Sequence, residues 1–385
     1  MSGPIIGILA GEASGDNLGA GLMRELKVLH PTCTFVGIGG PRMMALGLES
    51  LVPMERLSMN LFIDPLRRLP ELIRILVKLI RCYQAKRPAV FIGVDFNVFN
   101  LLLEGLLKRR GITTVHYVSP SVYAWRRGRV KRVAKAAHLL LTLYPFEPEF
   151  YSELPIDTVY VGHPLADEIS DTDGSDEARM KARRELGLPE EKLCIALLPG
   201  SRMSEVNYMA ETFLTAAELI KARVGDVGFV VPCLRPNIAA WLKEALESHR
   251  SLDVVRYEGN ARLALIACDA AIVKSGTGTL EAMLLRRPMV VSYKLGDLTF
   301  RMLRWIIRTP FIALPNILSG RMLVPELLQN DATPEALADN LLSSLSVLDK
   351  ASQEPETLLE FARLHELLRQ GADKKAAQAV ARLLA

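Results

Sequence analysis

Short apolar segments bounded by glycine or proline alternate with helical patterns along most of this chain. In the first half the apolar segments lie at 5–9, 34–38, 89–94, 113–118, 139–143 and 158–161, and the helical patterns at 19–29, 65–85, 96–109 and 129–136. Apolar strands that alternate with helices are typical of a parallel sheet covered by helices on both faces. The pattern therefore predicts an α/β fold with a doubly wound sheet.

The alternation of apolar strands and helical patterns is interrupted once and then resumes. "SDTDGSDEAR" (170–179) is polar and acidic like a linker, and further strands are expected at 194–198, 228–231, 253–257, 270–273 and 289–292. A chain of 385 residues is also about twice the usual domain size. We expect a first domain at 1–172, a second at 173–350, and C-terminal helices at 351–385 that pack back toward the first. Ligands of two such domains would bind in a cleft, beyond the carboxyl ends of the strands.

Apolar runs, cysteines and charge limit the classes of protein to which this chain can belong. No apolar run reaches the roughly 18 residues of a membrane span, and "MSGPIIGILAGE" does not read as a signal peptide. The five cysteines are scattered, which favours reduced thiols in a cytosolic protein, and no residues have metal-ligand spacing. The net charge is only +4, but basic residues cluster at 56–87 and 126–135. Such clusters indicate an anionic partner: nucleic acid, a lipid headgroup or a phosphorylated substrate.

Two loops of the second half have the composition of a phosphate-binding turn. Gly200, Ser201 and Arg202 follow the strand at 194–198, where backbone N–H groups and a guanidinium can bind an anion. An ordinary turn with a serine cap would look the same. The segment "SGTGTLE" repeats the pattern after another strand, with Ser275, Gly276, Thr277, Gly278, Thr279 and Glu281.

Two such loops in one domain favour a nucleotide diphosphate, with Glu281 suited to ribose hydroxyls, although a capping box would also place a glutamate there. Neither loop has the G-x-x-x-x-G-K-[ST] sequence, and G-x-G-x-x-G is absent after the first strand. An ATPase and a dinucleotide oxidoreductase are therefore disfavoured.

Acidic residues follow strands of the first half instead. "GEASGD" (11–16) carries Glu12 and Asp16, and Asp95 ends the strand at 89–94. A helix N-cap is an equal alternative for Asp95 taken alone. Three carboxylates expected at one sheet edge favour sugar binding and a general base that accepts a proton from a sugar hydroxyl.

An aromatic and basic segment follows the strand at 113–118. We interpret its rings, which lie beside polar groups, as suited to stacking on a sugar; the alternative for the aromatic residues is core packing. Its candidate residues are Ser119, Ser121, Tyr123, Trp125, Arg126, Arg127 and Arg129.

Two segments, 64–87 and 298–311, combine basic residues with a wide apolar face. Such helices bind membrane interfaces, but most helices of this pattern pack against their own sheet, and we weigh the two interpretations equally. The membrane candidates are Leu69, Ile73, Leu76, Ile80, Arg74, Lys78 and Trp305.

Together these motifs resemble one family. "GEASGD", "GPRM", "HYVSPSVYAWR", "GHPLAD", "LLPGSR", "SGTGTLE" and "LPNILSGR" occur in the order seen in lipid-A-disaccharide synthases, over nearly the whole chain. The resemblance implies a GT-B architecture of two Rossmann-like domains. It implies an inverting glycosyltransferase that joins UDP-2,3-diacylglucosamine to 2,3-diacylglucosamine 1-phosphate through a β-1,6 bond and releases UDP. It also implies action at the cytoplasmic face of the inner membrane of Gram-negative bacteria, with no metal and no cofactor.

The resemblance also implies roles for residues. The two glycine-rich loops would hold UDP, with Asn316 and Arg321 of "LPNILSGR" nearby, and Arg202 would stabilise the departing diphosphate. Asp95 is the first choice for general base, with Glu12 and Asp16 as alternatives. The candidate residues at 119–129 would bind the acceptor together with Ser14, and the basic cluster would take the acceptor's 1-phosphate.

One departure from the family matters. The family segment reads G-I-D-x-P-D-F-N, but here it is "GVDFNVFN", so Asn97 replaces the proline and Val98 the second aspartate. Other interpretations are a different UDP-sugar enzyme, such as a UDP-N-acetylglucosamine epimerase or a peptidoglycan-type transferase, and a non-catalytic nucleotide-sugar-binding protein at the membrane surface. Nucleic-acid binding is not expected, and a homodimer stays open.

Overall fold

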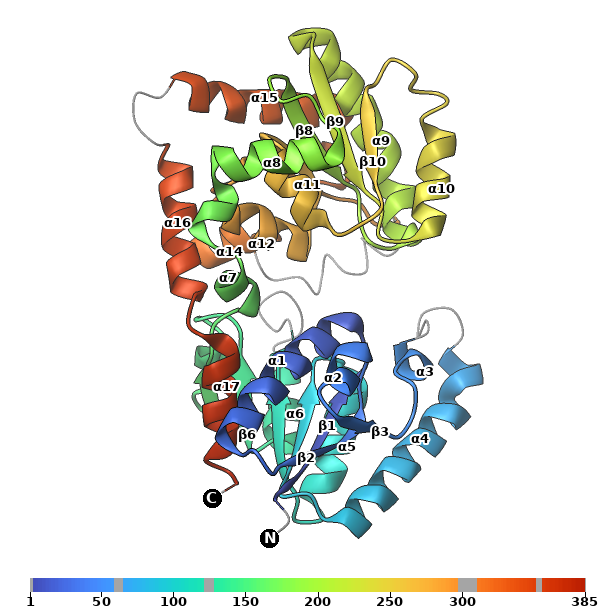
Figure 1. Ribbon diagram of the computed structural model, residues 1–385, viewed down its shortest axis with the longest axis vertical. Helices are drawn as coiled ribbons and strands as arrows, with labels where there is room; N and C mark the ends of the chain where they lie inside the picture. The colour runs from blue at the N-terminus through green and yellow to red at the C-terminus, as the bar shows by residue number, and fades with distance from the viewer. Residues whose placement is uncertain (1–2, 59–64, 121–127, 297–309, 351–354, 385) are drawn as a thin grey trace. The chain divides into compact units, whose positions relative to one another are not determined.

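The computed structural model describes residues 3–58, 65–120, 128–296, 310–350 and 355–384 (Figure 1). It contains two compact units, Met1–Asp167 with Leu368–Ala385, and Glu168–Leu367. The domain borders predicted from the sequence, after residues 172 and 350, remain predictions.

Unit 1 is built on a seven-stranded sheet in the order β3-β2-β1-β4-β5-β6-β7, with every pair of neighbours parallel. Its strands are β1 (Ile5–Ala10), β2 (Thr34–Ile38), β3 (Leu48–Ser50), β4 (Val90–Val94), β5 (Thr113–Tyr117), β6 (Leu139–Thr142) and β7 (Asp157–Tyr160). The central strands are apolar and buried along their whole length, as expected of a sheet that is covered on both faces.

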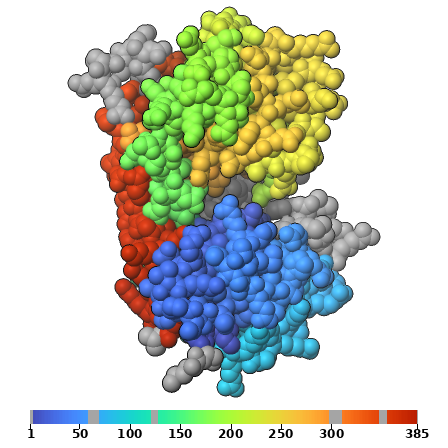
Figure 2. Space-filling model, viewed as in Figure 1, coloured from blue at the N-terminus to red at the C-terminus, as the bar shows by residue number. Residues whose placement is uncertain are grey.

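The helices of unit 1 are α1 (Ala13–Leu29), α2 (Pro41–Ala45), α3 (Glu55–Ser58), α4 (Pro65–Lys86), α5 (Asn97–Lys108), α6 (Arg129–Ala136), α7 (Pro164–Glu168) and α17 (Ala372–Ala381), with a 3-10 turn at Pro148–Tyr151. Helices α4 and α5 bury Ile75, Leu79 and Leu103 in one core with the sheet. The C-terminal helix α17 packs along α1, and Figure 2 shows the last residues of the chain against the N-terminal ones.

Unit 2 contains a second parallel sheet, in the order β10-β9-β8-β11-β12-β13. Its strands are β8 (Leu193–Leu198), β9 (Val227–Pro232), β10 (Val254–Tyr257), β11 (Ala270–Lys274), β12 (Met289–Tyr293) and β13 (Glu326–Leu328). Its helices are α8 (Asp176–Leu186), α9 (Met203–Val224), α10 (Pro236–Ala245), α11 (Ala261–Ala267), α12 (Thr277–Leu284), α14 (Leu314–Ser319), α15 (Pro334–Lys350) and α16 (Glu356–Leu368), with 3-10 turns at Asp171–Gly174 and Gln329–Asp331.

Each sheet has one point where the strand order reverses. In unit 1 the chain runs outward from β1 to β3 and returns to β4, and in unit 2 it runs from β8 to β10 and returns to β11. The loops that leave the two central strands then diverge to opposite faces of the sheet, so the carboxyl ends between them stay uncovered. These two switch points are the places where ligands are expected.

The predicted fold class is confirmed, and the predicted strands are found within one or two residues of their observed bounds. The edge strands β3 and β13 were not predicted, because each has only three residues and too little apolar sequence to stand out. Helix α1 begins at Ala13, six residues earlier than predicted, so Asp16 lies in its first turn and not in a loop.

The buried side chain of Asp16 is bonded to the backbone at the start of α2. One carboxylate oxygen accepts hydrogen bonds from the N–H groups of Gly40 and Met43 at 2.8 and 3.1 Å, and the other from Arg42 at 3.0 Å. These are N–H groups that a helix start leaves without an intrahelical partner. Asp16 therefore joins α1 to α2, which is a structural role.

We predict that Asp16→Ala destabilises the protein by about 3 kcal/mol, because it leaves several backbone N–H groups buried without an acceptor. Urea unfolding followed by circular dichroism measures this change. The neighbouring exposed residue provides a control, and Asn17→Ala should change stability by less than about 0.5 kcal/mol. Unchanged stability in Asp16→Ala would contradict the structural role.

Candidate functional site

The switch point of unit 1 carries a hydrogen bond between two residues far apart in the sequence. The Ser14 hydroxyl, on the first turn of α1, donates to a carboxylate oxygen of Asp95 at 3.1 Å, just after β4. Glu12 is the N-cap residue of α1 and is half-buried beside the same turn. Of the three predicted carboxylates, Glu12 and Asp95 therefore lie at the switch point, whereas Asp16 is bonded to α2.

The backbone around Asp95 is strained. Asp95 and Phe96 both adopt left-handed conformations, with φ of 49° and 45°. Val118, just after β5, has a φ of 85°, which is rare for a β-branched residue. Each such residue costs roughly 1–3 kcal/mol, and such strain tends to occur at functional sites.

Bonds from neighbouring elements hold the Asp95 loop. The Asp95 N–H donates to the carbonyl of Tyr117 on β5 at 2.8 Å. The buried amide of Asn100, on α5, donates to the Asp95 carbonyl at 2.8 Å and also lies near the carbonyls of Val94 and Leu9. The loop is thus fixed to β5 and α5 in addition to its bond with Ser14.

A fully buried histidine and glutamate lie beneath this loop. His116 Nδ1 is 2.8 Å from Glu104 Oε1, and His116 Nε2 is 2.9 Å from the side-chain oxygen of Asn97. His116 and Glu104 have no exposed surface. Burial raises the pKa of Glu104, and the neighbouring imidazole opposes that rise. Neither residue was among the predicted site residues.

The described part of the acceptor segment is turned inward. Ser119 is buried, with its hydroxyl 2.9 Å from the Tyr151 hydroxyl, so it belongs to the interior. Arg129 is half-buried at the start of α6. The other predicted acceptor residues lie outside the described residues: Ser121, Tyr123, Trp125, Arg126 and Arg127.

The switch point of unit 2 is cationic. Gly200 leaves β8 with a φ of 138°, a conformation that only glycine adopts readily, and Ser201 and Arg202 are exposed before α9. The Ser201 N–H donates to Glu205 Oε2 at 2.9 Å. Lys274, the last residue of β11, pairs with Glu205 Oε1 at 3.1 Å, and Arg202 lies 3.9 Å from the same oxygen.

Glu205 therefore links β8 and β11 across this switch point. Burial by itself raises the pKa of Glu205, but Lys274, the Ser201 N–H and Arg202 outweigh it, and the pKa is lowered. The ammonium group of Lys274 also lies 5.0 Å from the ring centre of Tyr293, a cation–π contact. An ionised carboxylate thus occupies the position at the start of α9 where anions bind.

The second glycine-rich loop is only partly available to a ligand. Gly276 and Thr277 are exposed at the start of α12, and Gly278 is half-buried. The Ser275 hydroxyl donates to the Ile312 carbonyl at 3.0 Å, and the buried Thr279 hydroxyl donates to the Gly276 carbonyl at 2.7 Å. Thr279 thus supports the loop from inside.

Glu281 is half-buried one turn into α12, and its pKa is raised by burial, with Arg262 opposing the rise and Glu168 adding to it. This carboxyl is near the surface that the loop presents.

In the segment "LPNILSGR", the side chain of Asn316 is fully used in hydrogen bonds within unit 2. Asn316 is fully buried: its amide donates to Val324 and Glu326, and its oxygen accepts from the N–H groups of Leu323 and Val324. Every hydrogen-bonding position of this side chain is taken, so Asn316 shapes the loop before β13. Arg321 is exposed and pairs with Glu356 at 2.7 Å.

Helix α4 presents an apolar and basic stripe to solvent. Leu69, Ile73 and Val77 recur every four residues and are exposed, as are Arg74 and Lys78. The predicted membrane residues Leu76 and Ile80 instead pack against the core of unit 1, because they lie on the flank of the buried face. Val77 takes the outward position that the prediction missed, and Trp305 lies outside the described residues. No helix within the described ranges is long and apolar enough to cross a membrane.

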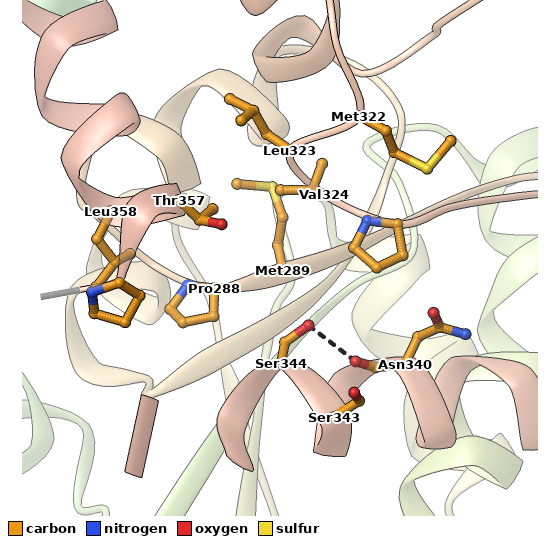
Figure 3. Close-up of a pocket in the computed structure, with 12 residues that line it drawn as sticks. Pro288, Met289, Met322, Leu323, Val324, Asn340, Ser343, Ser344, Thr357 and Leu358 are labelled. Atoms are coloured by element: carbon orange, nitrogen blue, oxygen red, sulfur yellow. Dashed lines mark hydrogen bonds between the residues drawn. The ribbon is translucent and has the colours of Figure 1, made fainter. Parts of the chain in front are cut away.

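A groove of about 360 Å³ lies elsewhere on unit 2 (Figure 3). Pro288 and Met289 at the start of β12 line it, with Met322 and Val324 before β13 and Thr357 on α16. Because these are the amino ends of the strands, the groove is at the opposite end of the sheet from the switch point.

Four residues at the two switch points escaped sequence reasoning: Lys274, Glu205, His116 and Glu104. Lys274 directly precedes Ser275, so its position after β11 was a usable signal. The other three carry no local signal, because their partners lie on different elements.

Comparison with known proteins gives a consistent result. The family described as "Lipid-A-disaccharide synthetase" matches residues 6–380. The lipid-A-disaccharide synthase of Methylobacillus flagellatus is 47% identical over 382 residues, which cover 98% of each chain. That of Pseudomonas savastanoi pv. phaseolicola is 47% identical over 385 residues, covering 100% of this chain and 98% of the relative.

Solved structures share the fold at low sequence identity. An Anabaena protein, HepE, in complex with UDP-glucose has a TM-score of 0.56 at 12% identity, covering 99% of both chains. A UDP-GlcNAc 2-epimerase from Neisseria meningitidis bound to UDP-GlcNAc has a TM-score of 0.59 at 11% identity, again over 99% of both chains. These likenesses agree with two Rossmann-like units of GT-B architecture. Together with the match along almost its whole length, they lead to one conclusion: the chain belongs to the lipid-A-disaccharide synthetase family.

Proposed function

We propose that the two switch points serve the two substrates of one glycosyl transfer. Membership of the family makes this chain a glycosyltransferase of lipid A synthesis, which forms the lipid A disaccharide from a nucleotide sugar and a lipid. The proposal concerns which substrate each unit binds and what the residues do. The observation that carries it is a difference in charge: Glu12 and Asp95 at the switch point of unit 1, and the two cations Arg202 and Lys274 around the single carboxylate Glu205 at that of unit 2.

The donor in this proposal is UDP-2,3-diacylglucosamine, bound by unit 2. Its diphosphate would lie near the cations Arg202 and Lys274 and the exposed start of α12 at Gly276, in competition with Glu205, since helix starts and cations bind phosphate. Glu281 would accept hydrogen bonds from the ribose hydroxyls. Structures of the same fold with UDP-glucose and UDP-GlcNAc support a UDP-sugar in this role.

The acceptor in this proposal is 2,3-diacylglucosamine 1-phosphate, with Asp95 as the general base. Asp95 takes the proton of the 6-hydroxyl while that oxygen attacks C1 of the donor sugar. The bond from C1 to the diphosphate breaks, UDP leaves, and attack from the opposite face inverts C1 to a β-1,6 linkage. Arg202 stabilises the negative charge that develops on the leaving diphosphate.

Asp95 is preferred over the two other carboxylates because of its contacts. Asp16 has its oxygens engaged by three backbone N–H groups, whereas Asp95 accepts one side-chain bond, from Ser14. Glu12 stays an alternative base. A UDP-GlcNAc epimerase is the weaker candidate, because the likeness to such enzymes is one of fold alone, at 11–14% identity.

We further propose that the chain acts as a peripheral protein at the cytoplasmic face of the inner membrane. The support is the exposed stripe of α4, where Leu69, Ile73 and Val77 adjoin Arg74 and Arg81. Apolar side chains would enter the interface while the cations contact anionic headgroups.

We predict that Asp95→Asn lowers kcat for disaccharide formation by about 10²–10⁴-fold, because an amide cannot take the hydroxyl proton. The affinity for UDP, measured by calorimetry, should not change, since that site lies in unit 2. Asp157→Asn, an exposed aspartate at the start of β7, is the control. Full activity in Asp95→Asn would rule out this base.

Val98 gives the same assignment a second test. It is 79% exposed on the first turn of α5, three residues after Asp95. If Asp95 is sufficient, Val98→Asp retains turnover and moves the acidic limb of the pH–rate profile to higher pH, because two nearby carboxylates raise one pKa. A natural chain without turnover that gains it in Val98→Asp would show that Asp95 alone is not sufficient.

We predict that Lys274→Gln weakens UDP binding at least about tenfold, because a charged contact to phosphate is worth roughly 1.5–3 kcal/mol. Isothermal titration calorimetry at fixed salt measures the dissociation constant. Lys192→Gln, a change at a half-buried lysine of the same unit that pairs with Asp226, makes the same change in net charge and should have no effect. Equal affinities in the two variants would remove Lys274 from the donor site.

We predict that Ile73→Asp reduces co-sedimentation with vesicles containing anionic phospholipid about fivefold or more, because a charge replaces an apolar contact in the interface. Val28→Asp on α1 is the matched control, since Val28 is also an exposed apolar helical residue of unit 1, at 69% against 50% for Ile73. An equal loss in both variants, or none in Ile73→Asp, would contradict membrane binding through α4.

A further inference from the structure

The buried pair of Glu104 and His116 has no role in the proposed chemistry, yet it lies next to the strand that leads to Asp95. His116 lies opposite Gly93 in the register of β5 and β4, and Gly93 precedes Asp95 by two residues. A Cβ atom on Gly93 would lie 2.1 Å from Glu104 Oε1, so only glycine leaves room for this carboxyl. The pair is therefore packed directly against the strand that ends in Asp95.

The hydrogen bonds of His116 lead toward the Asp95 loop. His116 Nε2 hydrogen-bonds with the side-chain oxygen of Asn97, and Nδ1 hydrogen-bonds with the Glu104 carboxyl. Both ring nitrogens are thus used, and the imidazole orientation is fixed. Asn97 is the first residue of α5, and it follows the left-handed residues Asp95 and Phe96.

Helix α5 lacks the usual means of fixing its start. Its N-cap residue is Phe96, which offers no side-chain acceptor and makes no side-chain cap bond. The bond from Asn97 to His116 attaches this end of the helix to β5 instead. A change in that bond would let the start of α5, and with it the Asp95 loop, relax from the left-handed conformation.

Unpaired polar atoms beside the pair indicate that the packing under the Asp95 loop is tightly constrained. Glu104 Oε2 and Asn100 Oδ1 are both buried with no hydrogen-bond partner among the described residues. Such atoms are costly and uncommon in folded proteins. The other end of Asn100 donates to the Asp95 carbonyl, so these atoms belong to the framework of the same loop.

We infer that Glu104 and His116 are positioning residues, which hold Asp95 in its strained conformation through Asn97. The inference rests on the proposed role of Asp95 as general base. Misplacement of a reacting group by about 1 Å can cost on the order of a hundredfold in rate. The pair therefore acts on kcat and not on substrate affinity.

Three variants test the inference: Asn97→Ala, Glu104→Leu and Glu104→Gln. Asn97 is half-buried at the loop, so Asn97→Ala should fold even if Glu104→Leu does not. We expect Asn97→Ala and Glu104→Leu to lower kcat about 10- to 100-fold while KM for both substrates stays within about twofold. Glu104→Gln, whose amide still hydrogen-bonds with Nδ1, should recover most of the rate.

Amide hydrogen exchange of residues 94–97, followed by mass spectrometry, gives a readout that does not require activity. Exchange should be faster in Asn97→Ala and Glu104→Leu and near that of the natural chain in Glu104→Gln. Glu147→Gln is the matched control: Glu147 is a buried carboxyl of unit 1 that accepts from the N–H groups of Leu143 and Tyr144. It should leave kcat and this exchange unchanged.

The outcomes distinguish a failure of this inference from a failure of the proposed function. Normal kcat in Asn97→Ala and Glu104→Leu, or a Glu104→Gln variant as slow as Glu104→Leu, would overturn the inference. A natural chain that forms no disaccharide would instead refute the proposed function, and the exchange of residues 94–97 would still show whether the pair fixes this loop.

Discussion

The reversal of strand order in each parallel sheet is the constraint on which both candidate sites depend. Loops from β1 and β4 turn to opposite faces of one sheet, and those from β8 and β11 do the same in the other. Residues far apart in sequence meet at these points, as Ser14 meets Asp95 and Glu205 meets Lys274. At both points the sheet hydrogen bonds between the neighbouring strands fix the backbone from which these side chains extend.

Arg202 and Lys274, at the switch point of unit 2, both lie close to the carboxylate of Glu205. A cation near a carboxylate lowers its pKa and makes it a poorer base, whereas a diphosphate requires cations for binding and departure. The lowered pKa of Glu205 beside Lys274 shows this effect in unit 2. Asp95 is bonded instead to the neutral hydroxyl of Ser14.

The sequence predicted what depends on local pattern and missed what depends on pairing between elements. Apolar runs bounded by glycine located the central strands, and the residues after them located both switch points. The same reasoning placed Asp16 in a loop, because it could not show that Asp16 accepts from the backbone at the start of α2. Nor could it show that the side chain of Asn316 is saturated by hydrogen bonds of the loop before β13. His116 and Glu104 lie 12 residues apart on a strand and a helix, so no periodic pattern connects them.

The departure of this chain from the family segment fits the network around Asp95. The family's proline at position 97 would fix φ at the first residue of a helix through its ring. Asn97 has no such ring, but its side chain is bonded to His116, so a hydrogen bond restrains the position where the ring would act. Val98 contributes no carboxylate and is exposed, so Asp95 is the one acid of residues 93–100. The strained conformation of this loop therefore depends on its hydrogen bonds. It depends on them more than it would in a loop that also has the proline ring and a second aspartate.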